Sequence, residues 1–165
     1  MILVVTLDED LAVARTLRGR GLDVMVTGLV RDPVLRREAL AAGLRESLFD
    51  LAAPELSISD WADFVGGFHA LAARASVVVL AGGLPARLPD DAFAQLVRAT
   101  GTPVVLSTSG PPLAAGVAAR PAAVAASVAE LIDAVTDLEE PPCSRRPLTS
   151  STPPGARAMA PARST

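Results

Sequence analysis

Apolar residues fall into two kinds of segment along this chain. Short runs that are nearly all apolar and rich in β-branched residues predict strands at Ile2–Leu7, Asp23–Leu29, Ser76–Ala81 and Pro103–Ser107. These runs lack the alternation of a strand with one wet face, so both faces of the sheet are expected to be covered. The pattern therefore predicts the α/β class, with three layers: a mostly parallel sheet and helices on both of its faces.

Between the strands, apolar residues recur at helical spacing. Helices are predicted at Leu11–Arg18, Pro33–Ala42, Ser59–Ala73, Asp90–Arg98 and Ser127–Val135, with one more beginning near Pro111. The second of these has Asp32 as its N-cap, Pro33 at its first position and Gly43 as its stop signal. Ser127 and Glu130 have the spacing of a capping box. The end signals thus agree with the apolar periodicity.

The composition changes after Leu138. Residues 139–165 contain six of the 14 prolines, set among Ser, Thr, Ala and Arg with almost no bulky apolar residue. Such a segment cannot bury enough apolar surface to offset the entropy of ordering it. One α/β domain is therefore expected over residues 1–138, followed by a disordered tail over residues 139–165.

Missing residue types exclude several chemistries. All 15 basic residues are arginine, so a phosphate loop that ends in Gly-Lys-Ser/Thr and a lysine Schiff base are both excluded. The chain has one histidine, His69, and one cysteine, Cys143, which are too few for a structural zinc site within one chain. Any metal site would have to be rich in carboxylates.

The charge pattern bears on partners and location. Residues 1–138 carry 16 acidic and 11 basic side chains, which argues against nucleic acid as a partner. No apolar run approaches the roughly 20 residues that span a bilayer, so no membrane partner is expected. The first strand meets Asp8 directly and has no basic residues before it, unlike a signal peptide. A cytoplasmic protein is the expectation.

Three segments carry a resemblance to a known family. The chain reads Ser-Val-Val-Val-Leu-Ala-Gly-Gly-Leu-Pro from Ser76 to Pro85, then Leu-Pro-Asp-Asp from Leu88, then Thr-Pro-Val-Val-Leu-Ser-Thr-Ser-Gly from Thr102 to Gly110. These segments resemble the Ser-Gly-Ser-x-Pro and Asp-Thr-Ser-Gly regions of the PfkB (ribokinase-family) carbohydrate kinases, phosphofructokinase branch. The resemblance implies a Rossmann-like, partial ribokinase-like fold, in a family that phosphorylates sugars with ATP and Mg²⁺.

Several motifs of that family have no counterpart in this chain. The loop Gly-Gly-Lys-Gly-x-Asn and the catalytic Gly-x-Gly-Asp are both missing, so the resemblance implies that the lid and the C-terminal nucleotide-binding part are missing too. The family's substrate-contacting Asp falls on Ala12, and the Asp of Asp-Thr-Ser-Gly falls on Ser107. The nearest substitute, Gly19–Asp23, has the wrong spacing and is typical of a helix stop and turn. No catalytic residue is therefore assigned.

Candidate ligand-binding residues follow the predicted strands, where α/β proteins bind their ligands. They are Asp8, Gly82, Gly83, Thr108, Ser109 and Gly110. The two adjacent glycines would admit a ligand close to the backbone, or would form a tight turn before Pro85. The two hydroxyl side chains would bind a sugar or phosphate, or would cap the helix near Pro111, and capping is the preferred reading.

Two groups of acidic residues are candidates for binding a metal or a cofactor. Asp8, Glu9 and Asp10 could hold Mg²⁺, but acids before a helix also stabilise its N-terminus, and this second reading is preferred, so no metal site is assigned. Glu130 resembles a family glutamate linked to Mg²⁺ and phosphate, which makes it the cofactor-binding candidate. Its alternative is the capping box with Ser127. No cofactor is expected for this chain itself.

Three functions remain after these exclusions. The preferred one is a sugar-phosphate kinase homologue that is not catalytically competent alone and keeps sugar-phosphate or subunit binding. The second is an active ATP-dependent kinase completed by a partner chain that supplies the complementary half. The third is a non-functional gene remnant. A sugar phosphate, a second copy of the chain and the complementary kinase half are thus the partners to test.

Overall fold

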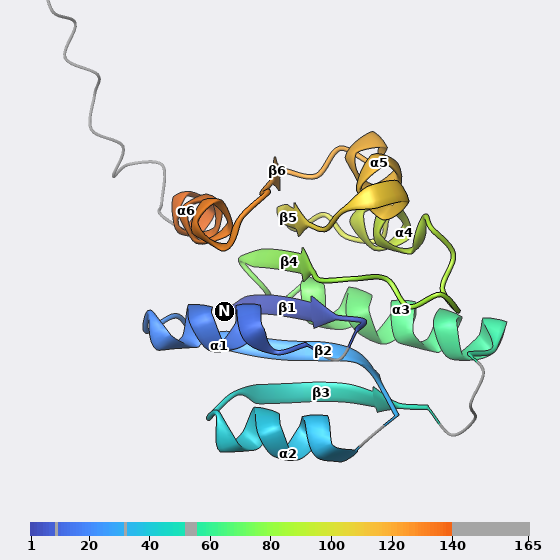
Figure 1. Ribbon diagram of the computed structural model, residues 1–165, viewed down its shortest axis with the longest axis horizontal. Coiled ribbons are helices and arrows are strands. Elements are labelled where there is room, and N and C mark those ends of the chain that lie inside the picture. The colour runs from blue at the N-terminus through green and yellow to red at the C-terminus, as the bar shows by residue number, and fades with distance from the viewer. Residues whose placement is uncertain (9, 32, 52–55, 140–165) are drawn as a thin grey trace, which may run out of the picture.

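The computed structural model describes residues 1–8, 10–31, 33–51 and 56–139, in which strands alternate with helices (Figure 1). The strands are β1 (Ile2–Thr6), β2 (Val24–Val30), β3 (Arg45–Asp50), β4 (Val77–Ala81), β5 (Val104–Ser107) and β6 (Ala123–Val124). The helices are α1 (Ala12–Gly19), α2 (Pro33–Ala41), α3 (Ile58–Ala72), α4 (Ala92–Arg98), α5 (Gly110–Ala118) and α6 (Val128–Glu139). Every predicted strand and helix is present, whereas β3 and β6 were not predicted.

The strands form one sheet in the order β3-β2-β1-β4-β5-β6, and all neighbouring pairs are parallel. The mostly parallel sheet predicted from the apolar runs is thus confirmed. Because the chain moves outward through β2 and β3, then returns to the other side of β1 with β4, the order reverses between β1 and β4. This reversal is the switch point at which open α/β sheets place their ligands.

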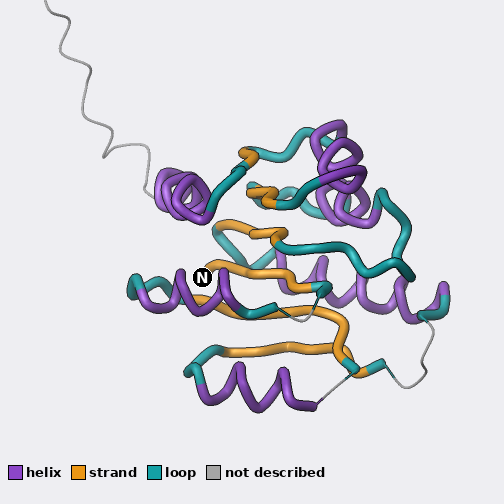
Figure 2. The backbone as a smooth tube through the Cα atoms, in the orientation of Figure 1, coloured by secondary structure: helices purple, strands orange, loops and turns teal. Residues whose placement is uncertain are grey.

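Helices cover both faces of the sheet, as the continuous apolar strands predicted (Figure 2). Buried residues of α1, α2 and α6 form one core cluster, and those of α3 and α4 form the other, which α5 flanks. Along β1, Ile2 and Val4 belong to the first cluster, whereas Leu3 and Val5 belong to the second. A single strand therefore contributes to two cores.

Helix ends follow local chemistry. Gly43 adopts φ +66°, and the Leu44 N–H donates to the Ala39 carbonyl at 3.0 Å, which confirms the stop predicted after α2. The predicted cap Asp32 lies outside the described residues. Helix α3 begins with a capping box between Ser57 and Asp60. The hydrogen bond from the Ser57 side chain, together with that from its backbone, lowers the pKa of Asp60.

The C-terminal helix is longer than predicted. Helix α6 runs from Val128 to Glu139, whereas the periodicity predicted an end at Val135. Residues 140–165 lie outside the described residues, so the predicted disordered tail stays a prediction.

Candidate functional site

A pocket of about 280 Å³ opens at the switch point of the sheet. It is lined by residues that follow the carboxyl ends of β1, β2 and β4, namely Leu7, Asp8, Arg31, Pro85 and Arg87. Open α/β sheets bind their ligands at this position, beyond the carboxyl ends of the strands. Of the residues predicted from the sequence to bind a ligand, Asp8 lines this pocket, whereas Thr108, Ser109 and Gly110 do not.

Asp8 joins the two strands that flank the switch point. One of its carboxylate oxygens, Oδ2, accepts a hydrogen bond from the Gly83 N–H after β4. The other, Oδ1, accepts from the Thr6 hydroxyl and from the Asp10 N–H, each at 3.3 Å. The carboxylate is therefore positioned from both sides, and it lines the pocket as its acidic group.

The two glycines after β4 make room for this carboxylate. Gly82 adopts φ +93°, and a Cβ added to it would lie 2.5 Å from the Asp8 Oδ2. A Cβ added to Gly83 would lie 3.3 Å from the same atom. Gly82 thus forms the turn that was one of its two predicted roles. The space next to its backbone is occupied by the Asp8 carboxylate, and its role in binding a ligand stays a prediction.

Two arginines supply positive charge to the pocket. Arg31 directly follows β2, and Arg87 lies in the loop between β4 and α4. The N-termini of α1 and α2 lie at this same edge of the sheet, where helix dipoles favour negative charge. The pocket is therefore suited to an anionic group. Neither arginine was predicted as a site residue, although Arg31 lies two residues after a predicted strand and Arg87 two residues after the Gly-Gly-Leu-Pro segment.

The hydroxyl residues after β5 do not line this pocket. Ser109 stands at the N-cap position of α5, but its side chain makes no capping hydrogen bond. The expectation that it caps the helix through its hydroxyl is therefore wrong, because Pro111 and Pro112 at the helix start lack N–H groups for it to bind. Gly110 begins the helix with φ +66°, which allows the sharp turn from the strand.

Glu130 is engaged locally. Its Oε2 accepts from the Ala126 N–H at 2.7 Å, and its own N–H donates to the Ser127 Oγ at 3.3 Å. The capping contact predicted from the Ser127–Glu130 spacing is confirmed on the Ser127 side, while the glutamate bonds one residue further back than the motif expects. This geometry favours the capping reading of Glu130 over the cofactor reading.

The acids after β1 also have local partners. The Asp10 Oδ1 accepts from the Ala12 N–H at 2.8 Å, at the start of α1, as the helix-start reading expected. Glu9 lies outside the described residues. Among the residues that the structure does describe, no group of three or more His, Cys, Asp or Glu could hold a metal ion.

A second, apolar pocket adjoins the first through a shared side chain. It has a volume of about 180 Å³ and is lined by Leu56, Ser57, Ile58, Trp61, Arg87 and Pro89. Trp61 is fixed by a hydrogen bond from its Nε1 to the Gln95 Oε1 at 2.7 Å. Trp61 is the one tryptophan of the chain and lines this pocket together with Arg87, so its fluorescence is a suitable probe for ligand binding near Arg87.

A larger pocket of about 450 Å³ lies at the amino ends of β5 and β6, at the end of the sheet opposite to the switch-point pocket. The residues that line it include Arg98 and Arg120. Helices α4 and α5 end near these amino ends of the strands, so their terminal carbonyls present negative partial charge to the pocket. The two arginines offset that charge. This larger pocket is therefore a poorer site for an anion than the switch-point pocket.

None of the described helices has the length and hydropathy needed to cross a membrane.

The fold is that of a doubly wound α/β protein, with a pocket at its switch point that two arginines and one aspartate line. No family model matches the chain. One stretch of 50 residues is 54% identical to a 1-phosphofructokinase from Xanthomonas campestris, and it covers 28% of this chain and 16% of that enzyme.

Two solved structures share the fold. One is a possible 1-phosphofructokinase from Thermotoga maritima, with a TM-score of 0.66, 15% identity, and coverage of 75% of this chain and 59% of that one. The other is a mutant of phosphofructokinase-2 from Escherichia coli, with a TM-score of 0.58, 15% identity, and coverage of 71% of this chain and 57% of that one.

These findings confirm the resemblance to the PfkB-type sugar kinases of the phosphofructokinase branch. The chain has a partial ribokinase-like fold, and one 50-residue stretch of it is similar to a 1-phosphofructokinase. It spans 59% and 57% of the lengths of the two structural relatives.

Proposed function

We propose that this chain binds a sugar phosphate at the switch-point pocket and does not transfer a phosphoryl group on its own. The observation that carries the proposal is the side-chain set of the pocket, where Arg31 and Arg87 accompany the carboxylate of Asp8. This set pairs two phosphate-binding cations with an acceptor for sugar hydroxyls.

Each pocket group has a role in this binding. Guanidinium groups bind phosphate through paired N–H donors, which makes arginine well suited to a phosphate monoester. An ionised carboxylate has about four acceptor sites. Asp8 keeps acceptor capacity for a sugar hydroxyl beside its bonds to Gly83, Thr6 and Asp10. The nearby helix N-termini add to the attraction for phosphate.

The proposed lack of turnover follows from what phosphoryl transfer requires. The reaction needs a carboxylate at the accepting hydroxyl and a set of donors around the transferred group. The sequence lacks the family motif that supplies both. The pocket measures about 280 Å³, close to the lower end of the roughly 300 to 1,000 Å³ that ligand pockets commonly have, which fits one small ligand such as a sugar phosphate.

A kinase completed by a partner chain is the second candidate function. It rests on the local similarity to a 1-phosphofructokinase, which is 54% identical over 50 residues. A second polypeptide would then supply the anion hole, the base, and the site for ATP and Mg²⁺. This candidate predicts turnover only when both polypeptides are present.

The test is calorimetric titration with fructose 1-phosphate and fructose 6-phosphate, with fructose as the unphosphorylated control. Quenching or a shift of Trp61 fluorescence provides a second readout. We expect a sugar phosphate to bind, fructose to bind at least about tenfold more weakly because the arginines have no phosphate to hold, and no ADP to form from MgATP.

Variants assign the binding to the pocket. Arg31→Ala and Arg87→Ala should each weaken sugar-phosphate binding about tenfold or more, the loss expected for a charge-assisted hydrogen bond. Arg98→Ala is the matched control, since Arg98 is an exposed arginine at the opposite edge. Binding that survives both pocket variants, or turnover by the chain alone, contradicts the proposal. If none of these ligands binds, the result would favour a non-functional gene remnant.

A further inference from the structure

The switch-point pocket and the apolar pocket meet at one side chain. Arg87 lines both cavities, which measure about 280 Å³ and about 180 Å³. The lining of the apolar pocket comes from the start of α3 and from the loop between β4 and α4. In Figure 1 these two segments approach each other at the carboxyl end of the sheet. A single ligand can therefore contact both pockets at Arg87.

Polar atoms that border the apolar pocket are bonded within the chain. The Trp61 Nε1 donates to the Gln95 Oε1 at 2.7 Å, and the Gln95 Nε2 donates in turn to the Asp91 Oδ1 at 3.0 Å. The Ser57 Oγ accepts from the Asp60 N–H at 3.1 Å in the capping box of α3. Because these polar atoms already have partners, a ligand gains from apolar contact in this pocket rather than from new hydrogen bonds.

The indole of Trp61 is held in position to receive a ring. Its centroid lies 5.5 Å from that of the fully buried Phe64, which meets Phe49 edge-on at 5.4 Å. Ile58, which is 91% exposed, and Pro89 add aliphatic surface to the same pocket. An apolar cavity of about 150 Å³ holds one benzene molecule. The apolar pocket, at about 180 Å³, therefore has room for a single aromatic ring.

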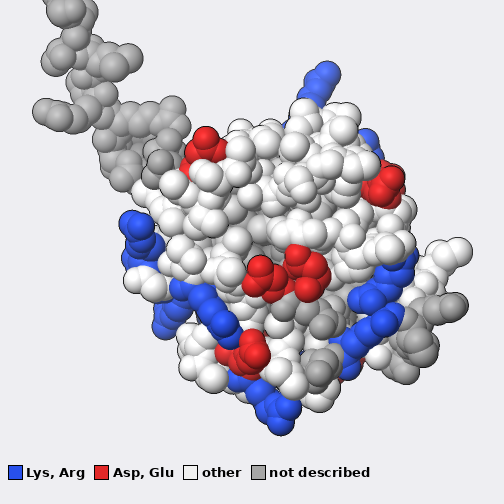
Figure 3. All heavy atoms as spheres, viewed as in Figure 1, with Lys and Arg blue, Asp and Glu red and all other residues white. Residues whose placement is uncertain are grey.

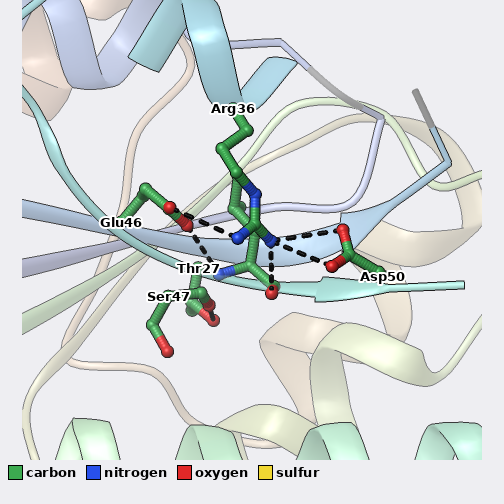
Figure 4. A network of polar contacts seen from close by, with 6 residues as sticks. Thr27, Arg36, Glu46, Ser47 and Asp50 are labelled. Carbon is green, nitrogen blue, oxygen red and sulfur yellow. Dashed lines mark hydrogen bonds and ion pairs between the residues drawn. The ribbon is translucent and has the colours of Figure 1, made fainter. Parts of the chain in front are cut away.

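On the β3 side, charged groups border the switch-point pocket. Asp50 pairs with Val30, the residue before Arg31. The Arg36 guanidinium donates to the Asp50 carboxylate at 3.2 Å and lies 3.6 Å from a Glu46 oxygen, so it stands between two carboxylates (Figure 4). An apolar group placed there would desolvate these charges at a cost. The apolar part of a ligand is therefore directed toward α3 and not toward β3.

The region of β5 and β6 offers little to an anionic group. From Gly110 to Ala129, Arg120 is the single charged residue. In Figure 3 most basic side chains lie in the lower half of the view, and the surface over α5, β5 and β6 is mostly white. The anionic end of a ligand is therefore attracted to Arg31 and Arg87 at the switch point. Its other end then lies next to the apolar pocket.

We propose that the apolar pocket binds an aromatic ring carried by the sugar phosphate, so that the ligand class is the aromatic glycosides of a sugar phosphate. The phosphate binds Arg31 and Arg87, and the ring packs against the indole of Trp61. Aromatic pairs attract beyond the effect of the area they bury, and a guanidinium next to the ring adds a cation–π attraction. The inference rests on the proposed function, because the phosphate anchors the ligand.

Calorimetric titration with a matched pair of ligands tests the inference. The pair is the benzyl and the methyl glycoside of fructose 1-phosphate or fructose 6-phosphate, whichever of the two binds more tightly. We expect the benzyl compound to bind about tenfold or more tightly than the methyl compound, because its ring leaves water. Benzyl fructoside without phosphate should bind at least about tenfold more weakly than its phosphate.

The outcomes separate this inference from the proposed function. If a fructose phosphate binds but the benzyl glycoside binds no more tightly than the methyl glycoside, the inference is wrong and the proposed function stands. If benzyl fructoside binds as tightly without its phosphate, the two pockets do not act on one ligand, and the inference is again wrong. If no fructose phosphate binds, both proposals are overturned.

Variants locate the ring. Trp61→Leu should bring the affinity for the benzyl glycoside down to that for the methyl glycoside, whose unchanged affinity shows that the variant is folded. Ile58→Ser changes a side chain that is 91% exposed, and it should weaken only the benzyl compound, by about threefold or more. Leu40→Ser is the matched control, because Leu40 is 60% exposed on α2 and lines neither pocket. A preference for benzyl that persists in Trp61→Leu, or an equal loss for both glycosides in Ile58→Ser, contradicts the inference.

Discussion

At the scale of single residues, the switch point depends on Asp8. Its Oδ2 accepts from the Gly83 N–H, while its Oδ1 accepts from the Thr6 hydroxyl and the Asp10 N–H. These bonds come from both strands that flank the switch point, so the carboxylate also ties the end of β1 to the end of β4. The same group therefore serves stability and the proposed ligand site.

The Gly82→Ala substitution tests this arrangement. Gly82 has φ +93°, and the new Cβ would lie 2.5 Å from the Asp8 Oδ2. Backbone strain alone costs about 1–3 kcal/mol, so we expect a loss of unfolding free energy of about this size or more, measured by urea denaturation. The displaced carboxylate should also weaken sugar-phosphate binding.

Gly101→Ala is the control for that substitution. A Cβ added at Gly101 meets nothing within 4 Å, and its φ lies outside the left-handed region. Its unfolding free energy should stay within about 0.5 kcal/mol of the wild type. If Gly82→Ala is no more costly than Gly101→Ala, the close approach of Asp8 does not constrain the loop.

The residue types at the site were only partly predictable. Asp8, Gly82 and Gly83 could be named because each follows a predicted strand, where a sheet of this class holds ligands. Arg87 could not, since arginine is the only basic residue type in the chain and nothing local distinguishes this one from its neighbours. Only the folded loop brings Arg87 beside the residue that follows β2, Arg31.

At the scale of elements, the two strands that the sequence did not indicate are the two edges. The β3 strand reads Arg-Glu-Ser-Leu-Phe-Asp, so its charged residues break the apolar run on which the other strands were recognised. The β6 strand is only two residues long, too short to give any periodic signal. Central strands can be recognised in the sequence because burial on both faces makes them continuous apolar runs, whereas these two edge strands lack such runs.

Arg36 is expected to protect the β3 edge from added strands. The Arg36→Ala variant removes the donor to the Leu48 carbonyl and the partner of Glu46 and Asp50. An uncovered edge is a template for pairing with other chains. We therefore expect faster aggregation on warming, followed by light scattering and thioflavin binding.

Arg37→Ala provides the comparison for Arg36→Ala. Arg37 is the next residue on α2, and its side chain is exposed. The Arg37→Ala variant removes the same charge and leaves the Arg36 contacts to β3 in place, so its aggregation rate should match that of the wild type. Equal aggregation of the two variants would attribute the effect to net charge rather than to the covered edge.

At the scale of the whole molecule, the order of the strands positions the proposed ligand site. The pocket is lined by residues that follow β1, β2 and β4, which are neighbours in the sheet. The parallel order and the helices on both faces, which the sequence predicted, bring these strand ends together within a single chain.

Sugar-phosphate binding should therefore not depend on the protein concentration. Every residue that lines the pocket belongs to one chain. Calorimetric titrations at two protein concentrations that differ about tenfold should give dissociation constants that agree within about twofold, a difference of about 0.4 kcal/mol. If affinity instead rises with protein concentration, contact between subunits completes the pocket or orders its loops, and the chain would then bind its ligand only as an assembly.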